Sequence, residues 1–276
     1  MLVGTEKAEI KILRLSQLAD QLTINAKGLE AQRCYEEMMR IAEVHGIRNL
    51  QRINLQWTSY LLRTGRFREA EEHLDTLNST RVDRTFRFRR DFYFQKGVIA
   101  TMRGAALEAY GNFDKAVTFA KSSTDTYNIP PVLINYAHCA EMLGNITLAR
   151  GCCEEALLIA RRNNFGWLIP FICLLYANIL STMGRHESAQ GYLVEAANWH
   201  AYVPILDCEL VATGIPLATR LKDKALLARC VKPEAIEFAL SSREPAIVGQ
   251  VCSAFANLYA EQGQLRKGSS LLQRAL

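Results

Sequence analysis

A glycine followed five residues later by a small residue recurs along this chain, and that spacing constrains the fold more than any other feature. Positions nine and twelve after each glycine are small or apolar as well. Offsets of five, nine and twelve fall on one face of an α-helix, so each glycine is expected to end one helix in the left-handed conformation just before a second helix begins. The five pairs are Gly65 with Ala70, Gly111 with Ala116, Gly144 with Ala149, Gly184 with Ala189, and Gly263 with Gly268.

Two weaker copies of the pattern complete the series. One lies near the middle of the long interval between Gly184 and Gly263, at Asp223, with Ala228 and Ala235 at the same offsets. The other begins at Ala26. Turns at 26, 65, 111, 144, 184, 223 and 263 predict an all-α superhelix of seven antiparallel helical hairpins that occupies 1–276 as a single domain. In this register Pro216 falls inside a helix and predicts a kink.

Composition and cysteine usage limit the class of protein. Hydrophobic residues make up 49% of the chain, which is ample for a continuous core, and the net charge of +5 is mild. The eight cysteines show no CxxC pair, which indicates a reducing cytoplasm, and Cys139 and Cys153 stand where other repeats carry small core residues. The most apolar stretch, 167–177, is too short to span a membrane. We therefore expect no membrane association, metal or cofactor.

Sequence motifs for catalysis are missing. There is no phosphate-binding glycine loop, zinc-binding HExxH or serine nucleophile elbow. His138 and Glu141, three residues apart on a predicted helix, are the only acid and base that could face one another in the groove. The leading expectation is a binding protein and not an enzyme, with this pair as the enzymatic alternative.

The alternation of helix, glycine turn and helix resembles the tetratricopeptide repeat. A standard unit has about 34 residues, and the longer units here are similar to the sensor superhelix of bacterial transcription activators of the maltose-regulon activator type. The resemblance implies that the first helix of each hairpin lines a concave groove. It further implies a protein-interaction or effector-sensing scaffold that binds a protein, a peptide or a small effector, as the regulatory domain of a signalling or transcription regulator.

Counting back from each turn predicts which side chains face that groove. Most of them are polar, as a binding site for an extended peptide or a small ligand requires. The alternative for any one of them is plain solvation. The predicted groove residues are Arg52, Ser59, Arg63, His138, Glu141, Asn178, Thr182, Arg220, Asn257 and Glu261.

The segment 81–103 supports a second interpretation, because it mixes arginines with aromatic residues. Such a composition suits phosphate contacts and base stacking, and it would assign nucleic-acid contacts to Arg84, Arg87, Arg89 and Arg90. The alternative is an amphipathic helix whose aromatic side chains enter the core while its arginines stay solvated. The mild net charge disfavours nucleic acid as the partner.

The last residues carry the repeat pattern to the end of the chain. Leu276 stops within the apolar stripe of the last helix, whereas repeat arrays usually end in a polar capping helix. We therefore expect either a fragment of a larger protein or self-association through that helix.

Overall fold

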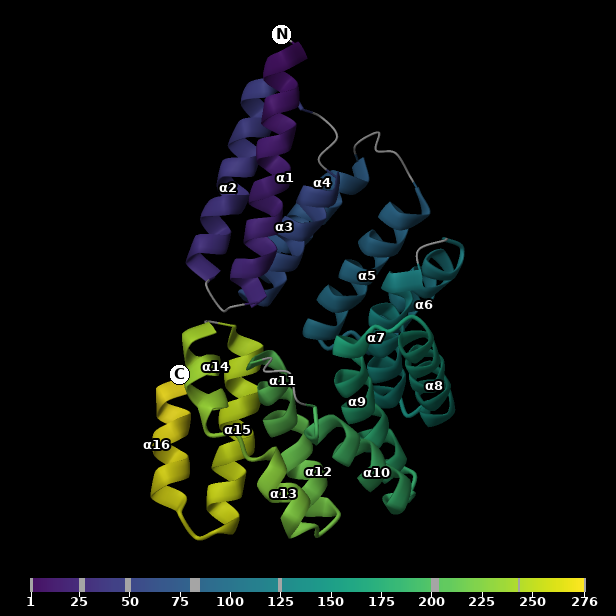
Figure 1. The fold of residues 1–276 in the computed structure, drawn as a ribbon, viewed down its shortest axis with the longest axis vertical. Coiled ribbons are helices and arrows are strands. Elements are labelled where there is room, and N and C mark those ends of the chain that lie inside the picture. The colour runs from purple at the N-terminus through teal and green to yellow at the C-terminus, as the bar shows by residue number, and fades with distance from the viewer. Residues whose placement is uncertain are drawn as a thin grey trace.

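The fold is a stack of antiparallel helical hairpins, which confirms the predicted all-α architecture (Figure 1). The computed structural model describes residues 2–24, 28–47, 51–79, 85–123, 126–199, 204–242 and 244–275, and it contains no strand in those ranges. Five hairpins come first: α1 (Leu2–Ile24) with α2 (Gly28–His45), α3 (Gln51–Arg63) with α4 (Phe67–Ser79), α5 (Phe86–Met102) with α6 (Ala106–Lys121), α7 (Ile129–Met142) with α8 (Ile146–Arg162), and α9 (Ile169–Thr182) with α10 (His186–Ala197).

The C-terminal third is less regular. Its helices are α11 (Pro204–Glu209), the π-helical η3 (Leu210–Gly214), α12 (Ile215–Arg220), α13 (Lys224–Cys230), α14 (Glu234–Ser242), α15 (Pro245–Glu261) and α16 (Leu265–Ala275). Two 3₁₀ turns, η1 (Thr126–Asn128) and η2 (Gly166–Leu168), precede α7 and α9. No helix in the described part of the chain has both the length and the apolar character needed to cross a bilayer.

The turns within the hairpins use glycine in the left-handed region, as predicted at four of the five glycines. Gly65, Gly144, Gly184 and Gly263 have φ angles of 77°, 76°, 74° and 75°. At Gly144 the backbone N–H donates to the carbonyl of Glu141 at 2.9 Å, and the next N–H donates to that of Ala140 at 2.8 Å. These bonds satisfy the last carbonyls of α7 and reverse the chain.

The remaining glycine turn lies at Gly104, with a φ of 73°, so the prediction of a turn at Gly111 is wrong. Gly111 lies inside α6. A slip of seven residues is about two helical turns, and it keeps the same helix face, so Ala116 and Ala120 are buried in either register. With Gly104 in place, successive glycines stand 39, 40 and 40 residues apart (65 to 104, 104 to 144, 144 to 184).

The degenerate turn exists, but its left-handed residue is Lys222, with a φ of 57°. Asp223 follows as the N-cap of α13, and its side chain accepts a hydrogen bond from the Leu226 N–H at 2.9 Å. Ala228 is exposed, so its predicted place in the core stripe is wrong. The buried residues of α13 are Leu226 and Cys230. The turn predicted at Ala26 lies outside the described residues.

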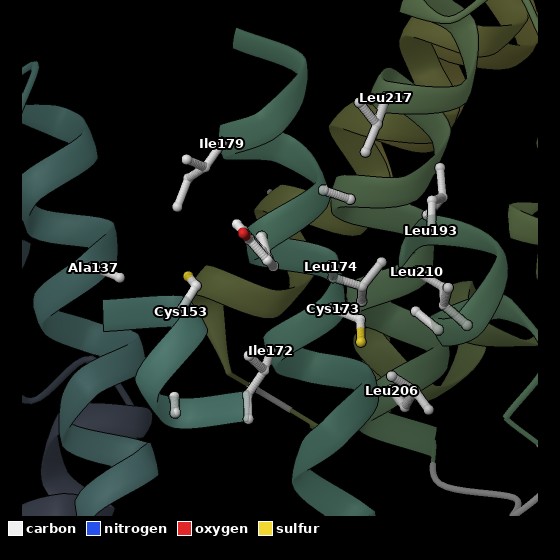
Figure 2. Close-up of a cluster of buried hydrophobic side chains, with 14 of the residues drawn as sticks. Ala137, Cys153, Ile172, Cys173, Leu174, Ile179, Leu193, Leu206, Leu210 and Leu217 are labelled. Atoms are coloured by element: carbon white, nitrogen blue, oxygen red, sulfur yellow. The ribbon is translucent and has the colours of Figure 1, made fainter. Parts of the chain in front are cut away.

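Small side chains allow the hairpins to pack closely. Ala137, Cys153, Ile172 and Cys173 lie fully buried where α7, α8 and α9 meet (Figure 2). All eight cysteines are buried and unbonded to one another, and Cys139 and Cys153 fill core positions as predicted. Burial raises the pKa of the Cys153 thiol, so these thiols remain protonated core groups.

Prolines mark the starts of first helices. Pro130, Pro170 and Pro245 stand in the first turn of α7, α9 and α15, where no intrahelical N–H is needed. Pro216 follows the π-helical segment η3 directly, so the first helix of the sixth hairpin departs from α geometry where a kink was predicted. The wider turn accommodates a proline that cannot donate a hydrogen bond to the preceding turn.

The superhelix returns on itself. From α1 to α4 the stack runs through α5 to α10 and comes back through α11 to α16, so that α14 lies near the lower end of α2 (Figure 1). The turn at Gly65 meets the start of α15 directly, since a Cβ placed on Gly65 would lie 3.3 Å from the Pro245 Cγ. We call this junction of the third and fifteenth helices the seam.

Candidate functional site

The first helices of the hairpins form the inner face of the superhelix. Each of α3, α5, α7 and α9 contacts the next first helix directly, in addition to its own hairpin partner. Their polar side chains therefore stand side by side across neighbouring repeats. The predicted groove residues were expected to lie on this inner face.

Three of the predicted residues come together on α7 and α9. The Asn178 Nδ2 donates a hydrogen bond of 2.7 Å to the Glu141 Oε1, and the His138 Nδ1 lies 3.8 Å from the Glu141 Oε2. His138 is exposed, whereas Glu141 and Asn178 are half-buried. Thr182, one turn beyond Asn178, is exposed, and its hydroxyl donates to the carbonyl of Ile179 at 2.7 Å. We call the first three residues the α7–α9 cluster.

The other predicted groove residues lie apart from this cluster. Ser59 is half-buried on α3. Arg220, Asn257 and Glu261 are exposed on α12 and α15, and no hydrogen bond among the described residues joins them to the cluster. Arg52 and Arg63 belong to α3, but their side chains lie outside the described part of the chain.

A polar cleft of about 480 Å³ opens between α3, α5 and η1. Its floor is Gln95, which is only 4% exposed. The Gln95 Nε2 donates to the Leu55 carbonyl at 2.5 Å and to the Ser59 Oγ at 2.9 Å, while its Oε1 is buried without a hydrogen-bond partner. An unsatisfied buried amide oxygen is costly, and this one lies beneath the cleft and not on its accessible surface.

The arginines of the 81–103 segment take several different positions. Arg87 is exposed at the rim of the cleft. Arg90 is 2% exposed and pairs with Asp91 at 2.7 Å, and the Arg89 guanidinium lies 5.6 Å from the centre of the Phe119 ring. Arg84 lies outside the described residues. The described part of the segment, 85–103, therefore does not present a row of free cations for phosphates.

Apart from Phe86, which is 52% exposed, the aromatic residues of the same segment behave as the alternative interpretation expected. Phe88 and Phe92 are buried, and their rings stack at 5.9 Å. Tyr93 stacks on Phe119 of α6 at 5.6 Å. These rings pack α5 against its neighbours and are not available for base stacking.

A row of side-chain amides was missed by the sequence reasoning. Gln56, Gln95 and Asn135 stand nine residues before the turns at Gly65, Gly104 and Gly144, and so occupy one matching place on α3, α5 and α7. Gln56 and Gln95 both line the cleft. The signal was available in the spacing, but it depends on placing the third turn at Gly104.

The C-terminal helix was expected to offer an apolar surface. On α16, Gly268 and Leu271 are buried, while Leu265 and Leu272 are 68% and 42% exposed. Leu276 lies outside the described residues. Self-association through this helix stays a prediction.

The repeated hairpins, glycine turns and inner row of polar residues define a tetratricopeptide-like superhelix. No protein-family model matches the chain, and no curated protein matches it. Among solved structures it is similar to a Rap protein complexed with competence and sporulation factor, with a TM-score of 0.67 and 14% identity over 98% of this chain and 75% of that chain.

Two further structures share the fold. The quorum sensor NprR from B. thuringiensis, in its apo form, has a TM-score of 0.60 and 16% identity over 98% of this chain and 75% of that one. A signal transduction ATPase with a tetratricopeptide repeat sensor, from Pyrococcus horikoshii, has a TM-score of 0.51 and 15% identity, covering 97% of this chain and 43% of that chain. At these identities the likeness establishes the fold.

Proposed function

We propose that this chain is a peptide-sensing regulatory scaffold, which binds a short extended peptide along the inner face from α3 to α9. The observation that carries the proposal is the row of amides Gln56, Gln95 and Asn135, continued by the α7–α9 cluster. A side-chain amide offers both a donor and an acceptor, which are the groups that a peptide backbone needs from its receptor.

The spacing of the row suits an extended chain. Packed helices lie about 8–10 Å apart, and an extended peptide advances about 3.3 Å per residue, so one amide falls opposite roughly every third residue of the ligand. Gln95 already holds an unsatisfied oxygen beneath the cleft. In this proposal the Gln95 side chain turns toward the cleft on binding, so that a ligand N–H satisfies an oxygen that the free protein leaves buried without a partner.

The structural likenesses support the same class of ligand. NprR has been solved in complex with its cognate peptide NprX, and the Rap protein with competence and sporulation factor. The likeness to a signal transduction ATPase with such repeats as its sensor supports the regulatory role. In this proposal the chain recognises its ligand and carries out no chemistry on it, and His138 and Glu141 serve as contacts.

Selection from a displayed library of random short peptides tests the proposal. Peptides enriched on the wild-type chain are titrated against Asn135→Ala and Asn178→Ala, with Gln273→Ala as the matched control, because Gln273 is exposed on the outer helix α16. Loss of one amide contact is expected to weaken binding about tenfold. Failure to enrich any peptide would count against the proposal. So would enriched peptides that bind both inner variants as tightly as they bind the wild type.

A further inference from the structure

A second pocket, of about 400 Å³, lies at the seam. One wall comes from the α3–α4 turn and the end of α5, and the other comes from α11, α14 and the start of α15. The lining is dominated by apolar side chains: Leu62, Phe67, Val98, Met102, Ile205, Phe238, Pro245, Ala246 and Ile247. Its size and apolar character are those of a site for a small molecule.

The polar groups of the seam pocket have a one-sided charge. Glu209 and Glu244 contribute two carboxylates, and the residues that the structure describes in the lining include no lysine, arginine or histidine. Glu244 is the N-cap of α15, where the helix dipole favours a negative charge. Glu209 stands at the end of α11, where the dipole offers no such help.

The Glu209 carboxylate is the exceptional group in this pocket. Desolvation raises its pKa, and the nearby His138 lowers that pKa without outweighing the desolvation. No side chain in the described part of the chain donates a hydrogen bond to it. A half-buried carboxylate beside apolar walls, without a side-chain donor, is matched by a cation that brings its own apolar body.

We infer that the seam pocket binds a small apolar molecule carrying an amine, whose ammonium group pairs with Glu209 while its hydrocarbon part fills the space between Val98, Phe238 and Ile247. The lining of this pocket shares no residue with the amide row proposed for peptides, although His138 of the α7–α9 cluster lies near enough to Glu209 to lower its pKa. Its two walls belong to distant parts of the chain, so an occupant contacts both sides of the seam at once and holds the superhelix closed.

Three ligands of similar shape and different charge test the charge assignment. Phenethylamine is a cation at neutral pH, phenethyl alcohol is neutral and hydrocinnamate is an anion. Calorimetric titration should show binding by phenethylamine, weaker binding by the alcohol and none by hydrocinnamate. Glu209→Gln should weaken phenethylamine by about tenfold or more, because a charge-assisted contact is lost, and leave the alcohol unchanged.

Matched controls separate this site from the rest of the molecule. Glu187→Gln changes an exposed glutamate on α10 and should leave amine binding as it is. Asn178→Ala should also leave it unchanged, so a failure of the peptide proposal would not affect this one. Val98→Phe, which narrows the pocket without touching its charge, should reduce binding of both the amine and the alcohol.

Two results would overturn the inference. One is equal affinity for the amine and the alcohol together with no effect of Glu209→Gln. The other is the absence of binding by phenethylamine and by longer and shorter primary arylalkylamines at millimolar concentration. Hydrogen exchange provides the second measurement, since bound amine should slow exchange in 62–67 and in 245–250 together, and protection of only one wall would contradict bridging.

The free protein should reveal the cost of desolvating the half-buried Glu209 carboxylate. Because the folded-state pKa of Glu209 is raised, its stabilising contribution is present at low pH, where the carboxyl is protonated, and is lost as pH rises through that pKa. Glu209→Gln should therefore melt at a higher temperature than the wild type at neutral pH and at the same temperature in acid. A lower melting temperature at neutral pH would show that Glu209 already has a partner.

Discussion

The first helices of the hairpins differ between two regions, α5 to α10 and the segment 204–242. In the former, each first helix is one uninterrupted α-helix that ends at a glycine with positive φ. In the latter, the first helix is divided by the π-helical η3 and ends at Lys222. In the regular region α5 and α7 carry an amide at the same inner position, whereas the irregular hairpin provides Glu209 at the seam. In the two proposals above, the repeated position serves an extended ligand and the irregular hairpin supplies one wall of the seam pocket.

The largest expected loss of stability comes from adding a methyl group at a glycine where two helices are in close contact. A Cβ on Gly97 would lie 2.6 Å from the Phe113 Cε1, and Phe113 is a ring with 1% exposure that has no room to move. We expect Gly97→Ala to destabilise the protein by about 2 kcal/mol through overpacking, as measured by urea unfolding. Replacing Phe113 by leucine in the same chain should recover part of that loss.

The irregular hairpin has a similar close contact, at Gly214, where substitution by alanine should be less destabilising. A Cβ on Gly214 would lie 2.8 Å from the Cys230 Sγ, which is a single side-chain atom. Gly214→Ala should cost less than Gly97→Ala, and Cys230→Ala should relieve it. If Gly214→Ala were the more damaging of the two, the expectation that a single sulfur atom yields more easily than a buried ring would be wrong.

Substitution by alanine should change the stability in opposite directions at two glycines that stand seven residues apart. Gly104 has positive φ, so Gly104→Ala is expected to destabilise by about 1 kcal/mol. Gly111 lies within α6 with nothing within 4 Å of its Cβ position, so Gly111→Ala should stabilise by roughly 0.5–1 kcal/mol. Urea unfolding of both variants measures the difference. The opposite pair of signs would place the turn at Gly111.

This pair of glycines also shows how far the sequence could predict the fold. The helical class, the hairpins and four glycine turns follow from local spacing, because a residue with positive φ and a small-residue stripe each leave a local pattern. Gly111 was misplaced because the stripe continues through Ala109, Phe113 and Ala116 at helical spacing, so two registers fit equally well. A regular spacing of about 40 residues between successive glycine turns distinguishes Gly104 from Gly111.

The candidate site was predictable only where it repeats. Glu141 and Asn178 follow from counting back from correct turns, and the structure joins them by a hydrogen bond. Gln56 and Asn135 were missed although their turns were predicted correctly, and for Gln95 the misplaced turn also hid the matching position.

The seam pocket brings Phe67 next to Pro245, residues that are distant in the sequence, and that proximity arises from curvature accumulated over many hairpins. No local pattern contains this information.

The smallest expected change in stability comes from replacing Lys222 by glycine, the residue that the other described hairpin turns use. Lys222 is exposed at a φ of 57°, a conformation that costs a lysine about 1 kcal/mol and glycine almost nothing. Glycine also loses more backbone entropy on folding, so the net stabilisation from Lys222→Gly should be about 0.5 kcal/mol in urea unfolding.

Asn164 provides the matched comparison for Lys222, since it is exposed after α8 in the regular region with a φ of 56°. Asparagine adopts the left-handed region more readily than lysine, so Asn164→Gly should give a smaller gain. If both substitutions stabilised equally, backbone conformation alone would govern both turns. If Lys222→Gly destabilised the protein, the lysine side chain would have to hold the irregular turn, and the two regions would differ in their side-chain contacts as well as in their helix geometry.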